Sequence, residues 1–222
     1  MRSLIKTLSN EKFTFLLAFL LIYALAAPFF EQIVALDLFM DISLSAVMLS
    51  AVFAVCQKKS SLIIILLLVL PGLFIIWVRF FVVTEKILFA MSVSQAFFNA
   101  YMIFIIIYYI FETQLVTRDI IAAALIAYLF IGLLGANLYL LVELIYPGSF
   151  SIPHETILKD PSVFKYFSFV TLTTLGYGDI SPISSQARSL SVLEALIGQI
   201  YLAVLIARLV GYKSTGSVQE NK

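Results

Sequence analysis

The chain has 222 residues, of which 62% are hydrophobic and 12% are charged, and its mean hydropathy is +1.07. Soluble domains are closer to half apolar and a quarter charged, so we expect an integral membrane protein. A net charge of +1 says nothing about nucleic acid, but the sequence contains no basic tract long enough to follow a phosphate backbone, so we expect no nucleic-acid partner. One cysteine and one histidine exclude an internal disulfide and a cysteine- or histidine-rich metal site.

Six apolar segments follow one another, separated by short charged breaks. Each is roughly long enough to cross about 30 Å of hydrocarbon as a helix, the second only barely. The predicted spans are residues 13–30, 42–56, 62–83, 87–111, 120–146 and 187–210. This pattern predicts an all-α membrane protein with six transmembrane helices.

Nine of the 14 Lys and Arg residues lie on one side if the N-terminus is cytoplasmic. The positive-inside rule then predicts a multi-pass protein of the plasma or inner membrane with both termini cytoplasmic. The start of the chain also resembles a cleavable signal peptide, but its apolar run is long and Glu11 is unusual there.

About forty residues separate the last two predicted spans. Pro147 and Gly148 end the fifth helix, and Asp160 or Ser162 can cap a new one. A helix over residues 162–173 would cover only about 18 Å, which is too short to span but suits a re-entrant helix. The chain must then return to the same side before residue 187.

The return peptide is the sequence TLGYGD, whose two glycines permit backbone torsions that other residues avoid. Irregular backbone at membrane depth is tolerated only where it is buried in protein or lines a water-filled path. Successive carbonyls could point toward one axis and replace the water around a dehydrated cation. The peptide is therefore the predicted functional site.

The sequence TTLGYGD, Thr173 to Asp179, resembles the selectivity signature of potassium channels. The resemblance implies a homotetramer in which Gly178 opens the outer mouth, and Tyr177 favours potassium selectivity over a non-selective pore. It implies K⁺ sites at the backbone carbonyls of Thr174, Leu175, Gly176 and Tyr177 and at the Thr174 hydroxyl.

The resemblance extends over a pore domain, residues 120–210, and implies its parts: an outer helix (120–146), a pore helix (162–173), a filter (174–179) and an inner helix (187–210). The expected remainder is a cytoplasmic N-terminus (1–12), a four-helix membrane domain (13–111), a linker (112–119) and a short tail (211–222). We expect the polar tail to be disordered and the chain to carry no soluble regulatory domain.

The residues that would support the filter are Thr173, Asp179, Tyr166 and Phe167. Many relatives carry paired tryptophans where Tyr166 and Phe167 stand, so the aromatic character is kept and the indoles are lost. Tyr166 could hydrogen-bond Asp179 and brace the filter. Some relatives have a glutamate in place of Val170, so their inactivation behaviour is not carried over.

Gly198 lies in the inner helix, where relatives often keep a flexible glycine. It is either a bend point for the gate or a site of close helix packing. Because positions four apart share a helix face, Gly198, Leu202 and Ile206 are expected to line the inner cavity, with Gln199 nearby.

Two titratable residues are candidate modulators. Glu194 in the last span could tune the cavity potential or sense pH, but a structural hydrogen bond to the pore helix is favoured. His154 in the outer loop could respond to pH, although a solvated histidine is the more common case.

The first four helices occupy the place of a voltage sensor, yet residues 87–111 contain no arginine. We therefore expect no steep voltage gating. Gln95 and Asn99 share a face of this segment and are expected to hold helices together.

These features predict a potassium-selective channel with passive conduction, no enzymatic activity and no cofactor besides the permeant K⁺, with membrane lipid around it. One alternative is the ion-translocating subunit of a potassium transporter, although such chains usually carry several filter-like loops. Another is a non-conducting membrane protein that assembles with a partner.

Overall fold

The computed structural model describes residues 12–25, 36–55, 59–82, 84–113, 117–152 and 162–219. Within these ranges the chain is almost entirely helical. The helices are α2 (Lys12–Leu25), α3 (Leu36–Val55), α4 (Lys59–Phe81), α5 (Glu85–Glu112), α6 (Arg118–Ile145), α7 (Ser162–Leu172) and α8 (Ser185–Gln219); the two short strands are β1 (Phe150–Ser151) and β2 (Ser181–Pro182).

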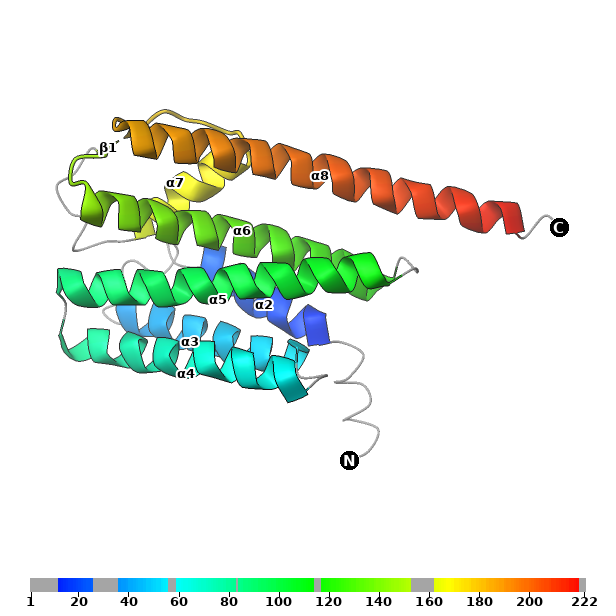
Figure 1. Cartoon of the computed structure of the whole chain (residues 1–222), viewed down its shortest axis with the longest axis horizontal. Coiled ribbons are helices and arrows are strands. Elements are labelled where there is room, and N and C mark those ends of the chain that lie inside the picture. Colours follow the sequence, from blue (N-terminus) through cyan, green and yellow to red (C-terminus); the bar gives the residue numbers. More distant parts are fainter. Residues whose placement is uncertain are drawn as a thin grey trace.

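Helices α2 to α6 pack as one bundle, and α8 runs along its edge beside α6 (Figure 1). The short helix α7 contacts both α6 and α8 near one end of the bundle. The C-terminal end of α8 projects past the other helices (Figure 1).

Within the described residues, three helices are long and apolar enough to cross a membrane: Glu85–Glu112, Arg118–Ile145 and the Ser185–Arg208 part of α8. Three further apolar stretches are shorter: Phe13–Ala24, Phe39–Val52 and Ile63–Val78. The chain is thus a helical, membrane-embedded protein, and the crossing of all six predicted spans stays a prediction.

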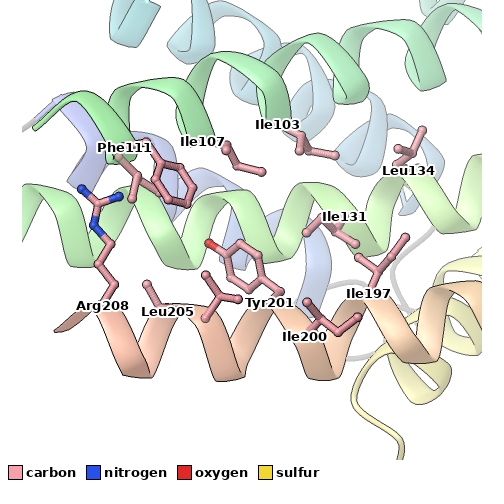
Figure 2. A pocket seen from close by; sticks show the side chains of 12 residues that line it. Ile103, Ile107, Phe111, Ile131, Leu134, Ile197, Ile200, Tyr201, Leu205 and Arg208 are labelled. Atoms are coloured by element: carbon pink, nitrogen blue, oxygen red, sulfur yellow. The ribbon is translucent and has the colours of Figure 1, made fainter. Parts of the chain in front are cut away.

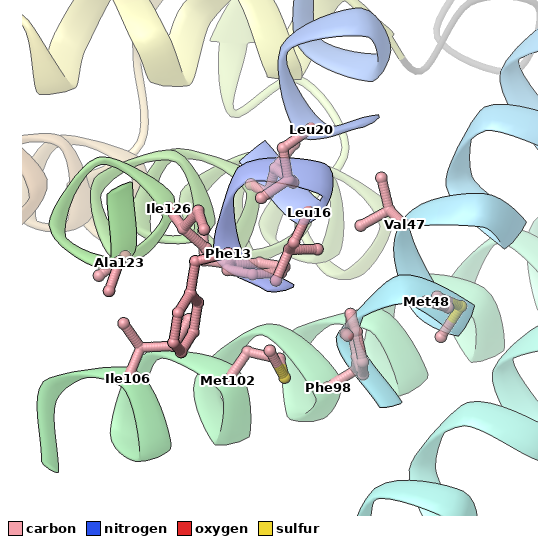
Figure 3. Close-up of a cluster of buried hydrophobic side chains, with 14 of the residues drawn as sticks. Phe13, Leu16, Leu20, Val47, Met48, Phe98, Met102, Ile106, Ala123 and Ile126 are labelled. Atoms are coloured by element: carbon pink, nitrogen blue, oxygen red, sulfur yellow. The ribbon is translucent and has the colours of Figure 1, made fainter. Parts of the chain in front are cut away.

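The main apolar core joins α2, α3 and α4 to α5 and α6 (Figure 3). On α2, Leu16 and Leu20 are fully buried and lie four residues apart, on one helix face. On α5, Phe98, Met102 and Ile106 repeat the same spacing and are at most 1% exposed. The core therefore continues from the four-helix domain into the outer helix α6.

The connection between α5 and α6 is short and capped at both ends. The Thr113 N–H donates to the Tyr109 carbonyl at 3.2 Å, and the Thr113 hydroxyl donates to the same oxygen at 2.9 Å. The Thr117 hydroxyl accepts from the Ile120 N–H at 3.4 Å, as an N-cap.

The prediction of a disordered tail from residue 211 is wrong for most of that segment, because α8 continues to Gln219. The predicted inner helix, 187–210, therefore extends at both ends. No proline interrupts α8, and each interior glycine lowers helix stability by only about 1 kcal/mol.

Candidate functional site

The stretch of residues 173–179, here called the glycine loop, follows α7 directly and alternates in backbone conformation. The φ angle is +58° at Thr174, +58° at Gly176 and +80° at Gly178. Glycine adopts such angles readily, whereas Thr174 is the one non-glycine residue with positive φ in the described part of the chain. A strained torsion of this kind persists only where its surroundings enforce it.

The start of the glycine loop is hydrogen-bonded back to the last turn of α7. The N–H groups of Leu175 and Gly176 donate to the Val170 carbonyl at 2.9 and 3.3 Å, and the Thr174 N–H donates to Thr171 at 2.9 Å. In a planar trans peptide the C=O points opposite to the N–H. The carbonyl that shares each of these three peptide planes therefore points away from α7.

The end of the glycine loop is tied to the middle of α7 by the hydrogen bond that the sequence predicts. The Tyr166 hydroxyl donates to Asp179 Oδ2 at 2.7 Å. This bond raises the pKa of Tyr166 to about 12, because the neutral hydroxyl is the form that donates to the carboxylate.

Phe167, the other predicted support residue, points into the protein and is 5% exposed, whereas Tyr166 is 41% exposed. The Phe167 ring meets those of Tyr139 and Phe150 edge-on, with centroids 4.8 and 5.4 Å apart. Phe150 also meets Phe164 at 5.2 Å. This aromatic cluster seats α7 against α6 and β1.

A two-residue antiparallel pairing holds the chain beyond the loop. Phe150 pairs with Pro182, and Ser151 pairs with Ser181. The Ile183 N–H also donates to the Ser149 carbonyl at 2.7 Å. These bonds attach the segment that follows the glycine loop, residues 181–183, to the segment that follows α6, residues 149–151.

Glu143 orders the turn that leads into β1, a role that was not predicted. Its carboxylate accepts from the Gly148 N–H at 2.7 Å and from the Phe150 N–H at 3.2 Å, and the residue is 6% exposed. The sequence held one signal for this role: Glu143 lies one helical turn before the Pro147-Gly148 pair.

Glu194 of α8 is 5% exposed and connects three helices. The Ser168 hydroxyl of α7 donates to its Oε1, and the Tyr139 hydroxyl of α6 donates to its Oε2, both at 2.5 Å. The favoured interpretation, a structural hydrogen bond to the pore helix, is confirmed by the Ser168 contact. Effects on cavity potential or pH response stay predictions.

Gly135 of α6 makes room for this carboxylate. A Cβ on Gly135 would collide with Glu194 Oε1 and would lie 2.7 Å from Ser168 Oγ. The absence of a side chain there lets α6, α7 and α8 converge on one buried acid.

Gly198 packs against the end of α7, and its place at an inner cavity stays a prediction. A Cβ on Gly198 would collide with the backbone carbonyl of Leu172 at the end of α7, which favours the close-packing alternative. Leu202, Ile206 and Gln199 are exposed in the single chain. The physical reason is that each four-residue step rotates about 40° around the helix, which turns the later positions away from α7.

The side of the chain that carries the glycine loop and α8 is left uncovered. Leu175 is 55% exposed and Tyr177 is 68% exposed. Only 11% of the apolar part of α8 is buried, against 61% for α6. An apolar helix this exposed in one copy requires lipid or another protein surface against it.

A cavity of about 410 Å³ lies between α5, α6 and α8 (Figure 2). Its lining is almost entirely apolar, with Arg208 and Phe111 at one end. The Arg208 guanidinium lies 4.8 Å from the Phe111 ring centroid and donates to the Thr113 carbonyl at 2.9 Å. Arg208 therefore joins α8 to the corner between α5 and α6.

The remaining predicted residues lie elsewhere. Gln95 and Asn99 are 6% and 4% exposed on α5, which agrees with a packing role. His154 lies outside the described residues.

Comparison with known proteins points to this same part of the chain. A family model described as an ion channel matches residues 124–213, which begin within α6 and include α7, the glycine loop and most of α8. The match supports the channel superfamily and a membrane-embedded protein.

Two curated relatives align over shorter stretches. Two-pore potassium channel 4 of Arabidopsis thaliana is 41% identical over 56 residues, which are 25% of this chain and 19% of the relative. Protein LctB of Bacillus caldotenax is 39% identical over 64 residues, 29% of this chain and 45% of the relative. The chain thus spans less than half of either relative, and no solved structure matches.

Proposed function

We propose that four copies of this chain assemble around one axis as a potassium-selective channel. The observation that carries the proposal is the backbone of the glycine loop, with positive φ at Thr174, Gly176 and Gly178 and with its first N–H groups directed to α7. The carbonyls on the other side would replace the hydration shell of K⁺. This geometry supports the proposed sites at the Thr174 and Leu175 carbonyls. The further proposed sites, at the carbonyls of Gly176 and Tyr177, rest on the resemblance to the potassium-channel signature.

The exposure of the loop supports an assembly of several copies. One chain offers one row of carbonyls, and a dehydrated cation must be surrounded. Tyr177 at 68% exposure, and the uncovered apolar surface of α8, would be covered by neighbouring subunits. Four loops around an axis give the arrangement that the potassium-channel signature implies.

The inner end of the pore would be formed by α8. Gln199, Leu202 and Ile206 are exposed and would face the axis below the filter. An apolar constriction made by four copies of Leu202 and Ile206 could close the path by dewetting.

The first four helices complete the proposed six-span subunit, with both termini cytoplasmic. α5 carries no arginine between residues 87 and 111, and its buried polar residues are the neutral Ser92, Gln95 and Asn99. A membrane potential has little charge to move there, so the open probability would depend only weakly on voltage.

The proposal is tested by K⁺ flux into liposomes that contain the purified protein alone. Flux down a K⁺ gradient, abolished by Gly176→Ala in a protein that still forms tetramers, is the expected result. Flux only with a second protein would favour the transporter-subunit or partner-dependent alternative, and equal flux in the variant would remove the glycine loop as the conducting site.

A further inference from the structure

The connection from α5 to α6 constrains how the four-helix domain is placed in an assembly. Thr113 closes the last turn of α5 and Thr117 caps α6, so only residues 114–116 lie between two capped ends. The chain from Thr113 to Thr117 has four Cα–Cα steps of about 3.8 Å, so these two residues can lie at most about 15 Å apart.

A connection this short joins antiparallel helices that pack on each other. If the four-helix domain lay on a neighbouring subunit, α5 would have to leave α6 of its own chain and cross to the next outer helix. The two capped threonines leave little chain for that crossing. The buried contact between Phe98 of α5 and Phe130 of α6, with centroids 5.9 Å apart, is the packing that a short connection favours.

Two further contacts tie the four-helix domain to the pore elements. The Lys165 ammonium of α7 lies 3.8 Å from the centroid of the Tyr23 ring of α2. At the other end, Arg208 of α8 stacks on Phe111 and donates to the Thr113 carbonyl, directly at the α5–α6 corner. The domain thus contacts both the pore helix and the inner helix.

We propose that each four-helix domain packs on the pore domain of its own chain, and not on that of a neighbouring subunit. This arrangement rests on the proposed tetramer. Movement of the four-helix domain then reaches the inner helix of the same subunit through Arg208, without passing through a neighbour.

The test uses two cysteine pairs in a Cys56→Ser background, which removes the one native thiol. The first pair is Tyr23→Cys with Lys165→Cys, and the second is Phe111→Cys with Arg208→Cys. The tetramer is verified by native mass spectrometry, treated with a short bifunctional thiol reagent, and analysed by denaturing gel and intact mass.

We expect each double variant to run as a monomer that has gained one bridging reagent and lost both free thiols. A mixture of the two single variants, co-expressed as a matched control, should give no covalent dimer beyond that of either single variant alone.

Crosslinks between chains would contradict packing within one chain and leave the proposed channel intact. They would appear as covalent dimers, trimers or tetramers of the double variants and as covalent dimers in the mixture of single variants. A tetramer in which neither pair crosslinks would overturn packing within one chain too, because the contacts would be absent. A monomer before crosslinking would overturn the tetramer of the proposed function itself.

Discussion

Glu194 of α8 and Ser168 of α7 share a hydrogen bond of 2.5 Å across 26 residues of sequence. Tyr139 of α6 completes the contact from the other carboxylate oxygen. One buried acid thus links α8, α7 and α6. If α8 shifts at this point, it must either break these hydrogen bonds or move together with α6 and α7.

Glu194→Ala should destabilise the protein strongly. It removes the carboxylate that accepts from both hydroxyls. Ser168 keeps the Gly132 carbonyl as an acceptor at 2.5 Å, whereas Tyr139 loses this bond, and a buried polar group without a partner costs roughly 1–3 kcal/mol. Glu194→Gln should cost less, because an amide can still accept one of the two bonds. Thermal unfolding of the purified protein in detergent measures both.

The matched control is Val192→Ala, two residues away on the exposed side of α8 at 61% exposure. Its effect should stay within about 0.5 kcal/mol. If Glu194→Ala unfolds at the same temperature as this control, the three-helix contact does not stabilise the fold.

Tyr166→Phe removes only the hydroxyl that reaches Asp179. We expect the tetramer to depend more steeply on K⁺ for its thermal stability and to inactivate faster, because the loop loses its tie to α7. Tyr146→Phe, at an exposed tyrosine at the end of α6, should leave both properties unchanged. If the Tyr166→Phe variant has the same K⁺ dependence and the same inactivation as the wild type, the hydrogen bond does not brace the loop.

Gly198→Ala should loosen the contact between α8 and α7, since the added Cβ collides with the Leu172 carbonyl. Overpacking of this kind typically costs about 1–3 kcal/mol. Leu202→Ala on the exposed side of the same helix is the stability control. Single-channel recording separates the two roles: unchanged open probability in a destabilised Gly198→Ala channel would exclude a hinge.

Gly178→Ala should abolish selective conduction while the helices stay folded. Nothing lies within 4 Å of a Cβ placed at Gly178, so the penalty comes from its φ of +80°, not from a collision. A left-handed torsion costs an L-residue about 1–2 kcal/mol.

Gly148→Ala provides the matched control for that experiment. Gly148 has a φ of +81° and is equally free of neighbours, but it lies in the turn after α6. Selectivity should survive there. If both variants conduct selectively, the left-handed torsion at Gly178 is not required by the site.

The sequence predicts the local features of this site well. The short helix before the glycine loop begins at Ser162 as expected, and the Tyr166–Asp179 bond was predicted, because both depend on residues within one local segment. The resemblance to a known signature also directed attention to the glycine loop, where Thr174, Gly176 and Gly178 have positive φ.

The long-range contacts could not be predicted in the same way. Tyr139 and Glu194 are 55 residues apart, and nothing in either local pattern identifies its partner. The contact of Gly198 with α7 was one of two alternatives that the sequence left open. The end of α8 was missed because polar, glycine-containing sequence can still continue a helix.

The most direct test of the central claim is the reversal potential of purified protein in a planar bilayer, with K⁺ on one side and Na⁺ on the other. The proposed channel predicts a value near the K⁺ equilibrium potential, with an open probability that changes little as voltage is stepped. A reversal potential near zero, with equal permeability to the two ions, would contradict a carbonyl-lined potassium filter.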